Sequence, residues 1–336
     1  MAIWKGTAID TDELTTVFNH LFNRKFIDQV SDKKGLLEVI MGKPSPNPDK
    51  AGAKAFQRIR GIPTGKDIEV KLLGSYKSIG TIADGAAEVA STVGAVVEKY
   101  GAAVFAPTHY NDQHWIPASQ YQRYKGDEAK TLSFIQDEYD FLIASFRETL
   151  AAGISGTANQ LRLSLGSWEY AVTNDNTYGT IDRSDAGNVD FRGLEKDTFG
   201  AFTLDKLQTE YTTLKAQEGY PDVMVAVGTV YNFVIRELRN EGTLIVNYGS
   251  DGKVGAGGSS FAWQGMDLIL DPHTSAETLG RLESKSFVMY MDDDGMNPSA
   301  MIDTSKKSAM LINMNGWNAF ICVIPKHNLK CNGVTT

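Results

Sequence analysis

The stretch NDNTYGTIDRSDAGNVDFRG, residues 174–193, decides how the rest of the chain is interpreted. It carries four Asp and two Arg among small residues. It contains no nucleophile beside a His and no recurring spacing of metal ligands. The pattern therefore argues against an active site.

Length and composition indicate a folded protein with a sizeable core. The chain has 336 residues, of which 42% are hydrophobic and 22% are charged, so two domains, or one domain with long excursions, are expected. The net charge of −8 gives no support to a general nucleic-acid-binding surface. Cys322 and Cys331 are too few for a disulfide framework or a structural zinc site.

The first residues and the hydropathy of the chain bear on its location. The start, MAIWKGTAIDTDELTTVF, lacks the apolar core and the small-residue cleavage site of a signal peptide. No run of 18 apolar residues occurs that would span a membrane. We expect a protein that is made and kept in the cytosol, or in a particle assembled there, without contact with a membrane.

The N-terminal third combines helix, proline-rich and strand signals. Residues 11–41 predict one or two helices, and Pro44 to Pro48 then break the pattern. Alternating apolar residues predict a strand over 66–73, and a second extended segment covers 103–116. Between them, eleven of the 24 residues from 80 to 103 are Gly or Ala. We interpret residues 66–116 as a long two-stranded excursion with a mobile tip, which needs a partner to lie on.

The strongest helix signal lies between Gly126 and Gly153. Apolar residues recur there at steps of three and four, as one face of a helix requires: Leu132, Ile135, Tyr139, Leu142, Ile143, Phe146 and Leu150. Asp127 and Glu128 suit the first turn, and Gly153 suits the end. Such a helix is longer than the globular average, so it predicts a spine.

An alternation of helices and strands follows residue 193. Residues 204–214 predict a helix that ends at Gly219 and Pro221, and DVMVAV predicts a buried strand. Residues 230–238 predict another helix, and MDLILDP predicts a second strand. The C-terminal SAMLINMNGWNAFICVIP predicts strands that return to a sheet.

Four local patterns resemble functional sites, and each has a simpler explanation. GSDGKVGAGGSS, residues 249–260, lacks the phosphate-binding motif and opens no helix, so it predicts a surface loop. Asp292, Asp293 and Asp294 lack the alternation and final Glu of a calcium loop, which favours an acidic turn, although a loosely bound divalent ion stays open.

The other two patterns are a histidine pair and a serine. His109 and His114 would diverge on an extended strand, and Asp112 adds no third converging ligand, so all three are expected to face solvent. Ser167 has no nucleophile-elbow glycines around it. We therefore assign no catalytic, cofactor-binding or metal-binding residue, and we expect no cofactor and no enzymatic activity.

The order of several motifs resembles that of the major capsid proteins of tailed bacteriophages with the Hong Kong 97-like fold. The spine helix is followed by TYGTIDRSD, then by PDVMVAVGTVYNFV and by FAWQGMDLILDP. Family members often carry T-Y-G-G-I-D-R-S after the long helix, and Thr180 stands here in place of the second Gly. The stretch DAGNVDFRG departs from the tryptophan-containing sequence that is common there. The resemblance covers residues 126–325 and extends to about residue 60.

The resemblance implies an α+β architecture with a defined division of the chain. It places an N-terminal arm at 1–60, an extended E-loop at 61–120, a P-domain with the spine helix at 121–165, an inserted A-domain at 166–285 and the returning P-domain strands at 286–336. The quoted stretch would then cross from the P-domain into the A-domain. Gly179 and Gly187 would permit tight backbone, and Asp182 and Arg183 would fix a turn or bridge to a neighbour.

The resemblance also implies a function in a virion. The chain would be a shell subunit that forms hexamers and pentamers of an icosahedral head around double-stranded DNA, assembled in the host cytoplasm. Its partners would be copies of itself, a separate scaffolding protein, a portal and possibly a decoration protein. Two alternatives stay open: an encapsulin-like compartment that holds a cargo enzyme, and a soluble α/β enzyme that uses Asp292 to Asp294.

Overall fold

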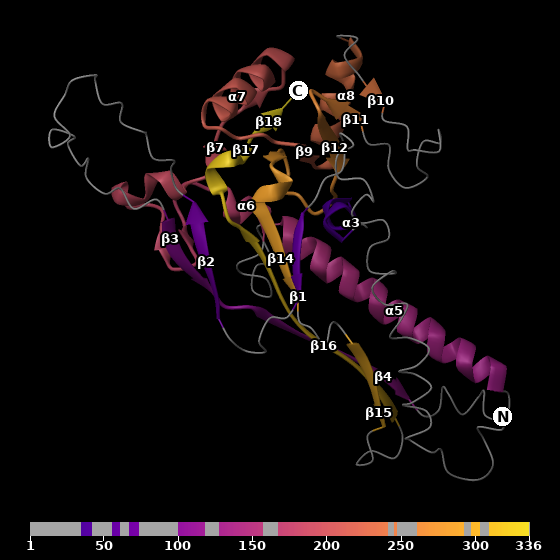
Figure 1. Cartoon of the computed structure of the whole chain (residues 1–336). Coiled ribbons are helices and arrows are strands. Elements are labelled where there is room, and N and C mark those ends of the chain that lie inside the picture. Colours follow the sequence, from indigo (N-terminus) through magenta and orange to yellow (C-terminus); the bar gives the residue numbers. More distant parts are fainter. Residues whose placement is uncertain are drawn as a thin grey trace, which may run out of the picture.

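The computed structural model describes the chain in ten segments (Figure 1). They are residues 35–41, 56–60, 67–73, 100–117, 128–156, 167–240, 245–246, 261–291, 297–302 and 309–335. The helices predicted before residue 35 and the proline-rich joint at Pro44 to Pro48 lie outside these residues. Helix α3, Gly35–Met41, is the first described element.

The long helix is present as predicted and runs slightly further. Helix α5 spans Glu128–Ser155, which is 28 residues or about 42 Å. Leu142, Ile143, Phe146 and Leu150 are buried, as their spacing indicates. Gly153 does not end the helix, because it lies buried inside the last turn and the amide of Gly156 still bonds to the carbonyl of Ala152 at 2.9 Å.

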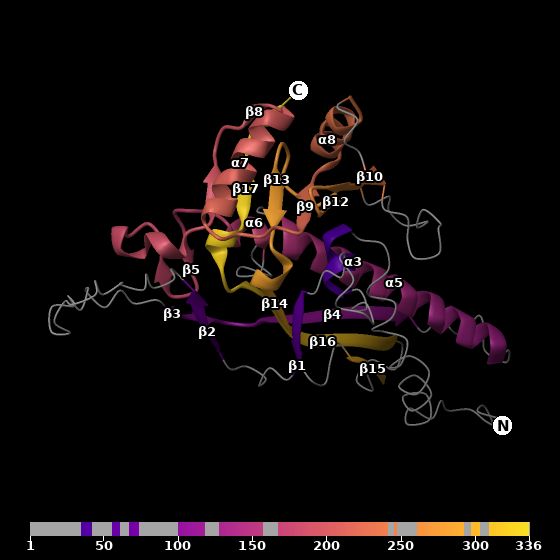
Figure 2. The ribbon, with the colours of Figure 1, turned by 45° about the horizontal axis from the view of Figure 1, so that its top comes forward.

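An elongated sheet runs alongside α5 (Figures 1 and 2). Its central strand is β16, Ala309–Cys322, which pairs antiparallel with β4, Thr108–Pro117, with β15, Asn297–Ile302, and with β14, Phe287–Met291. Strand β1, Gln57–Arg60, adds to β14 in parallel. The C-terminal sequence thus returns to a sheet, as predicted.

The excursion predicted over 66–116 needs correction. Its first strand is β2, Ile68–Leu73, but the segment 103–116 is two strands, β3, Tyr100–Phe105, and β4. Only β3 pairs with β2, whereas β4 pairs along its whole length with β16. Pro107 lies between them and cannot donate to a ladder. The base of the hairpin is also covered by its own chain, because Ile68, Val70, Ala103 and Phe105 are buried.

A second, seven-stranded sheet lies at the other end of the molecule (Figure 1). Its strands are β10 (Ile245–Val246), β11 (Phe261–Trp263), β12 (Met266–Leu270), β9 (Val223–Ala226), β13 (Leu279–Leu282), β17 (Leu329–Cys331) and β7 (Leu194–Lys196), in that spatial order. Helices α7, Leu204–Ala216, and α8, Gly228–Asn240, pack with it. Both helices and the strands β9 and β12 are confirmed predictions.

The end of the chain departs from the expected division. Residues after 286 were assigned to the returning strands, but β17 lies between β13 and β7 in the seven-stranded sheet. Strand β18, Val334–Thr335, then pairs with β8, Gly200–Ala201. Two short 3-10 helices, η3 (Ser284–Ser286) and η4 (Pro325–His327), flank β14 and β17. The C-terminus therefore ties the two sheets together.

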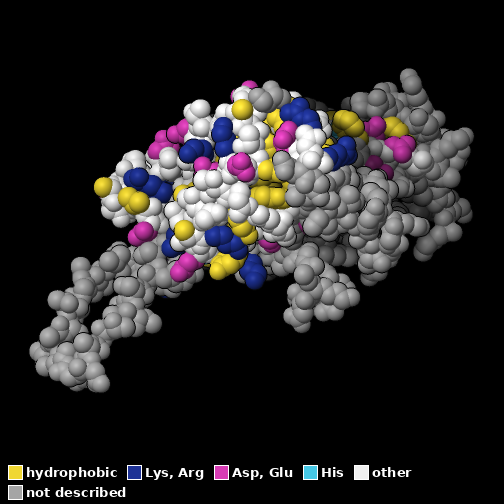
Figure 3. All heavy atoms as spheres, turned by 90° about the horizontal axis from the view of Figure 1, so that it is seen from above, with side chains coloured by type: hydrophobic (Ala, Val, Ile, Leu, Met, Phe, Trp, Pro, Cys, Tyr) yellow, Lys and Arg dark blue, Asp and Glu magenta, His cyan; other side chains and the backbone are white. Residues whose placement is uncertain are grey.

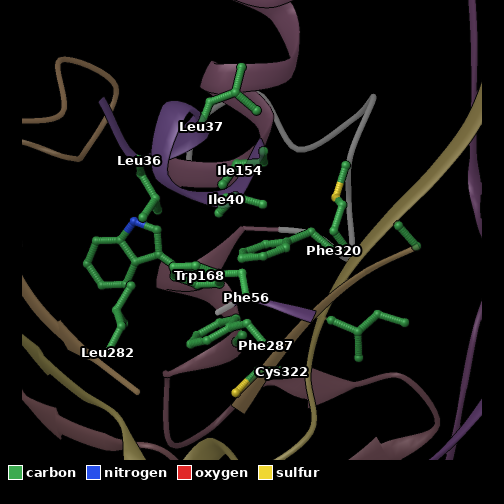
Figure 4. Packing of buried hydrophobic residues seen from close by; sticks show 14 of the residues in the cluster. Leu36, Leu37, Ile40, Phe56, Ile154, Trp168, Leu282, Phe287, Phe320 and Cys322 are labelled. Atoms are coloured by element: carbon green, nitrogen blue, oxygen red, sulfur yellow. The ribbon is translucent and has the colours of Figure 1, made fainter. Parts of the chain in front are cut away.

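Strand β9 separates two hydrophobic cores. Val223 and Val225 face a core built with α3, α5 and the elongated sheet, whereas Met224 and Ala226 face α7 and α8. Figure 4 shows the first core around Trp168, which is fully buried. Gly280 lies against that ring so closely that a Cβ atom there would be 2.6 Å from ring carbons. This contact sets how closely the segment around Trp168 approaches strand β13.

The described surface mixes charges of both signs. Seen from above, Lys and Arg side chains are interspersed with Asp and Glu (Figure 3). Among the described helices, none combines the length and the apolar character that crossing a membrane requires.

Candidate functional site: the turn beneath the hairpin

The quoted stretch forms a compact turn at the base of the hairpin. Strands β5, Thr177–Tyr178, and β6, Ile181–Asp182, pair antiparallel around Gly179 and Thr180. Gly179 has φ +60°, which L-residues with a side chain rarely adopt. Gly187 has no positive φ, so only one of the two glycines expected to permit tight backbone does so in this way.

A short helix precedes the turn and supplies acceptors to it. Helix α6, Trp168–Ala171, begins at Ser167, whose hydroxyl accepts a hydrogen bond from the amide of Tyr170 at 3.2 Å. Ser167 is therefore an N-cap. The helix leaves the carbonyls of Tyr170 and Ala171 without helical partners, as helix C-termini do. Both carbonyls accept hydrogen bonds from one buried side chain in the turn.

Arg183 is that side chain. It is fully buried, and its guanidinium donates to the carbonyl of Ala171 at 2.6 Å, of Tyr170 at 2.8 Å and of Asn176 at 3.2 Å. It also donates to the hydroxyl of Thr173 at 3.1 Å and to the side-chain oxygen of Asn176. Burial lowers the pKa of Arg183, but the carbonyls solvate its charge. The residue thus fixes a turn within its own chain.

The outer side of the turn is held by a second arginine and by aspartates. Arg192 donates from Nη2 to the carbonyls of Ser184 at 3.0 Å and Asp185 at 3.1 Å. Asp182 accepts from the amide of Ser184 at 3.0 Å and from its hydroxyl at 2.6 Å, which lowers the pKa of this exposed carboxyl. The 3-10 helix η2, Ala186–Phe191, follows, with Asp185 as its N-cap.

Tyr178 connects the turn to the elongated sheet and to the hairpin. Its hydroxyl accepts a hydrogen bond from the amide of Cys322 in β16 at 2.7 Å, and its ring meets Phe105 of β3 edge-on at 4.9 Å between centroids. The guanidinium of Arg183 lies 4.8 Å from the centroid of the same ring. Burial raises the pKa of the Tyr178 hydroxyl, so it stays neutral. Three elements therefore meet at one aromatic side chain.

The other sequence candidates do not gather into a site. The ring of His109 packs against Trp317 at 4.6 Å between centroids, and His114 contacts Glu138 of α5 at 2.5 Å. His109 is exposed, as expected, but His114 is half-buried, because it lies against Glu138 of α5. The side chain of Asp112, the loop 249–260 and Asp292 to Asp294 lie outside the described residues. Within the described ranges, no three His, Cys, Asp or Glu side chains are grouped as a metal site requires.

Sequence reasoning missed several buried charges, including Glu169, Asp271, Arg281 and Lys330. Glu169 in α6 accepts from the amide of Ser275 at 2.7 Å, and Asp271 accepts from the amide of His273 and the hydroxyl of Thr274, both at 3.2 Å. Burial raises the pKa of both carboxyls. Arg281 is buried in β13. The only sequence signal is a charged residue inside an apolar run, as in SWEYAV, and that signal is weak.

The polar groups of this turn have a structural role. The described groups of the turn hold backbone and aromatic rings in place, and no nucleophile there lies beside a base. The arrangement connects the hairpin β2–β3 to the elongated sheet through Tyr178.

Comparisons with known proteins agree with this architecture. No protein-family model matches the sequence, and no curated protein matches it. Among solved structures, the capsid of Cyanophage A-1(L) aligns with a TM-score of 0.59 at 11% identity, over 85% of this chain and 92% of that chain. The capsid of an empty GTA particle aligns with a TM-score of 0.52 at 10% identity, over 85% and 90%.

A third structure is the SrpI encapsulin complex from Synechococcus elongatus PCC 7942. It aligns with a TM-score of 0.49 at 14% identity, over 83% of this chain and 85% of that chain. With a TM-score below 0.5, this alignment supports neither the phage capsid nor the encapsulin interpretation. The first two alignments show that the chain has the α+β fold of phage major capsid proteins, which confirms the fold that the motif order predicted.

Proposed function

We propose that the chain is the major subunit of a phage head, forming hexamers and pentamers of an icosahedral shell around double-stranded DNA. The observation that carries this proposal is the fold, aligned with a cyanophage capsid protein over 85% of this chain. The role is structural and not enzymatic, and we assign no cofactor. The chain would be located in the virion, after assembly in the host cytoplasm.

The shape of the molecule suits self-association. The hairpin β2–β3 is a two-stranded sheet, and within the described residues no further strand pairs with it. An open strand edge of this kind is a template for pairing with another chain. We propose that the hairpin β2–β3 lies on a neighbouring subunit. The division into an arm at 1–60, an E-loop, a P-domain and an A-domain is part of the same proposal, with β4 counted in the elongated sheet and β17 in the seven-stranded sheet.

The charge of the chain is compatible with a container for DNA. A net charge of −8 avoids a basic lining that would hold the genome through phosphate contacts. Scaffolding, portal and decoration proteins are the further partners we propose. An encapsulin-like compartment is the alternative, because it would use the same fold around a protein cargo.

Negative-stain electron microscopy of the expressed chain, alone and with the scaffolding protein of the same genome, tests the proposal. We expect closed shells or hexameric rings. A monodisperse monomer under every condition would overturn it. Nuclease-protected DNA in particles isolated from an infected or induced host supports the phage head, whereas a co-purifying protein cargo without DNA supports the compartment.

A matched pair of variants links shell formation to the hairpin. Replacing residues 76–97 by a short Gly-Ser turn leaves the described strands β2 and β3 intact. We expect a native-like circular dichroism spectrum and no shells. As a control, Thr212→Val changes one exposed hydroxyl on α7 and should leave shell yield unchanged. Normal shells from the shortened chain would refute the assigned role of the hairpin.

A further inference from the structure

The outer edge of β3 carries a donor and an acceptor, two residues apart, that do not bond to β2. In the antiparallel register, Val104 lies opposite Glu69 and Ala102 lies opposite Lys71. The amide of Val104 and the carbonyl of Ala102 point away from β2, because both bond to a group on the other side. Such groups normally pair with the next strand of a sheet.

The hydroxyl of Thr180 takes the place of that strand. It accepts a hydrogen bond from the amide of Val104 and donates one to the carbonyl of Ala102, each at 3.3 Å. A single side chain thus satisfies both edge groups, as one residue of a third strand would. Thr180 itself is exposed, and it belongs to the turn that Arg183 anchors to the body.

Gly179 allows this approach. A Cβ atom at that position would lie 3.0 Å from the Cβ of Ala103 and 3.1 Å from the ring of Phe105, closer than ordinary van der Waals contact. The missing side chain lets the turn come near enough for the neighbouring hydroxyl to reach the β3 backbone. The pair Gly179 and Thr180 therefore combines a close approach with a directional contact.

The other contacts that the described residues show between the hairpin and the body are mainly apolar. Phe105 meets Tyr178, and Ile68, Val70 and Ala103 are buried in the same core. Apolar contacts are not directional, so they stabilise the hairpin without fixing its angle. Hydrogen bonds are directional, and those of Thr180 lie shortly before the break between β3 and β4 at Ala106 and Pro107.

We propose that Thr180 is a positioning residue that fixes the orientation of the hairpin β2–β3 relative to the body of the subunit. The inference deepens the proposed function. Its consequence for assembly rests on that function, whereas the orientation of the hairpin in the free chain does not. By setting the angle at the base of the hairpin, Thr180 determines where the far end of the hairpin meets a neighbouring subunit.

Hydrogen exchange and spin-label distances on the free subunit test the inference. Thr180→Val keeps the shape of the side chain and removes both hydrogen bonds. We expect exchange in the peptide 101–106 to become roughly fivefold faster or more, with an unfolding midpoint close to that of the parent. Labels at the exposed positions Lys71 and Thr209, introduced as Lys71→Cys and Thr209→Cys, should show one narrow distance that broadens in the variant. Cys322 and Cys331 are buried and stay unlabelled.

Two further variants separate positioning from general stability. Thr180→Ser retains the hydroxyl and should restore slow exchange and the narrow distance. Thr212→Val removes an exposed hydroxyl on α7 and should change neither. Unchanged exchange and an unchanged distance in Thr180→Val would overturn the inference.

The shell assay then reports on assembly separately. Failure of the parent to form shells would count against the proposed function and would leave the measurements on the free subunit interpretable. If the parent forms shells, we expect Thr180→Val to lower their yield severalfold, and equal yield with a broadened distance would overturn the link between angle and assembly.

Discussion

The turn at residues 177–192 and the seven-stranded sheet each bury an arginine, and the two surroundings differ. Every side-chain nitrogen of Arg183 donates to a carbonyl or side-chain oxygen of residues 170–176. Arg281 donates from Nη2 to the carbonyl of Leu207 at 2.6 Å, while its Nε and Nη1 have no hydrogen-bond partner within the described residues. Its guanidinium lies 5.3 Å from the ring centroid of Trp263 and 5.7 Å from that of Tyr211.

The difference separates two uses of a buried cation. Arg183 collects carbonyls that the end of α6 and the following loop leave open, so it determines local backbone structure. Arg281 packs between aromatic rings, and burial lowers its pKa to about 10. A buried charge is therefore not by itself a sign of a functional site; what matters is whether other groups depend on it.

Removing Arg183 should have the largest effect. Arg183→Met leaves the carbonyls of Tyr170, Ala171 and Asn176 buried without this donor, so we expect a loss of about 4 kcal/mol in the free energy of unfolding. Urea titration followed by circular dichroism measures it. Arg183→Lys should recover only part, because an ammonium cannot reproduce the planar set of donors. A loss below about 1 kcal/mol would mean that the turn does not depend on the guanidinium.

The glycines of the same turn give an intermediate effect and its control. Gly179→Ala should cost about 1–2 kcal/mol, because φ is +60° and the new methyl group meets Ala103 and Phe105. Gly187→Ala has ordinary φ and its nearest neighbour at 3.6 Å, so it should be neutral in the same titration. Equal costs at both positions would show that the close approach at Gly179 is not needed.

Glu169 extends the comparison to a buried anion. Its raised pKa means that the folded protein binds the proton more tightly than the unfolded chain. This contribution to stability is present below the ordinary glutamate pKa near 4.5 and is lost as pH rises through the raised value. Relative to the parent, Glu169→Gln should therefore become more stable as the pH rises from 4 to 8, because burial raises the pKa of the Glu169 carboxyl that it replaces. A pH-independent difference in unfolding free energy would contradict the direction of the shift.

Replacement of Arg281 should have the smallest effect. Arg281→Leu removes a charge whose desolvation is poorly compensated, and similar exchanges are neutral or stabilising. We expect a change within about 1 kcal/mol, in either direction, in the same urea titration. A loss as large as that of Arg183→Met would remove the distinction between the two arginines.

Sequence periodicity was sufficient for the local elements. The apolar stripe from Leu142 to Leu150 predicted α5, and the uniformly apolar run at 223–226 predicted the buried strand β9. Both signals depend on neighbours within a few residues. Gly153 was misassigned as a helix end because a glycine tolerated inside a packed helix looks the same in sequence as one that stops it.

The partners of strands that pair with distant parts of the chain could not be predicted from local periodicity. The segment 103–116 has a uniform extended pattern, yet its two parts pair with β2 and with β16, about 200 residues further on. Pro107 was the available signal for the break. The partners of Arg183 were equally hidden, since the carbonyls of Tyr170 and Ala171 become acceptors only through the position where α6 ends.

Strand β16 has a mechanical consequence. It is continuous over 14 residues, and its ladders to β4, β15 and β14 together reach from one end to the other. A force applied along this strand loads its hydrogen bonds in shear, so many of them carry the load at once, whereas a force across the strand would open them one at a time. The molecule is therefore stiff along β16 and compliant across it, and any assembly built from such molecules inherits that direction of stiffness.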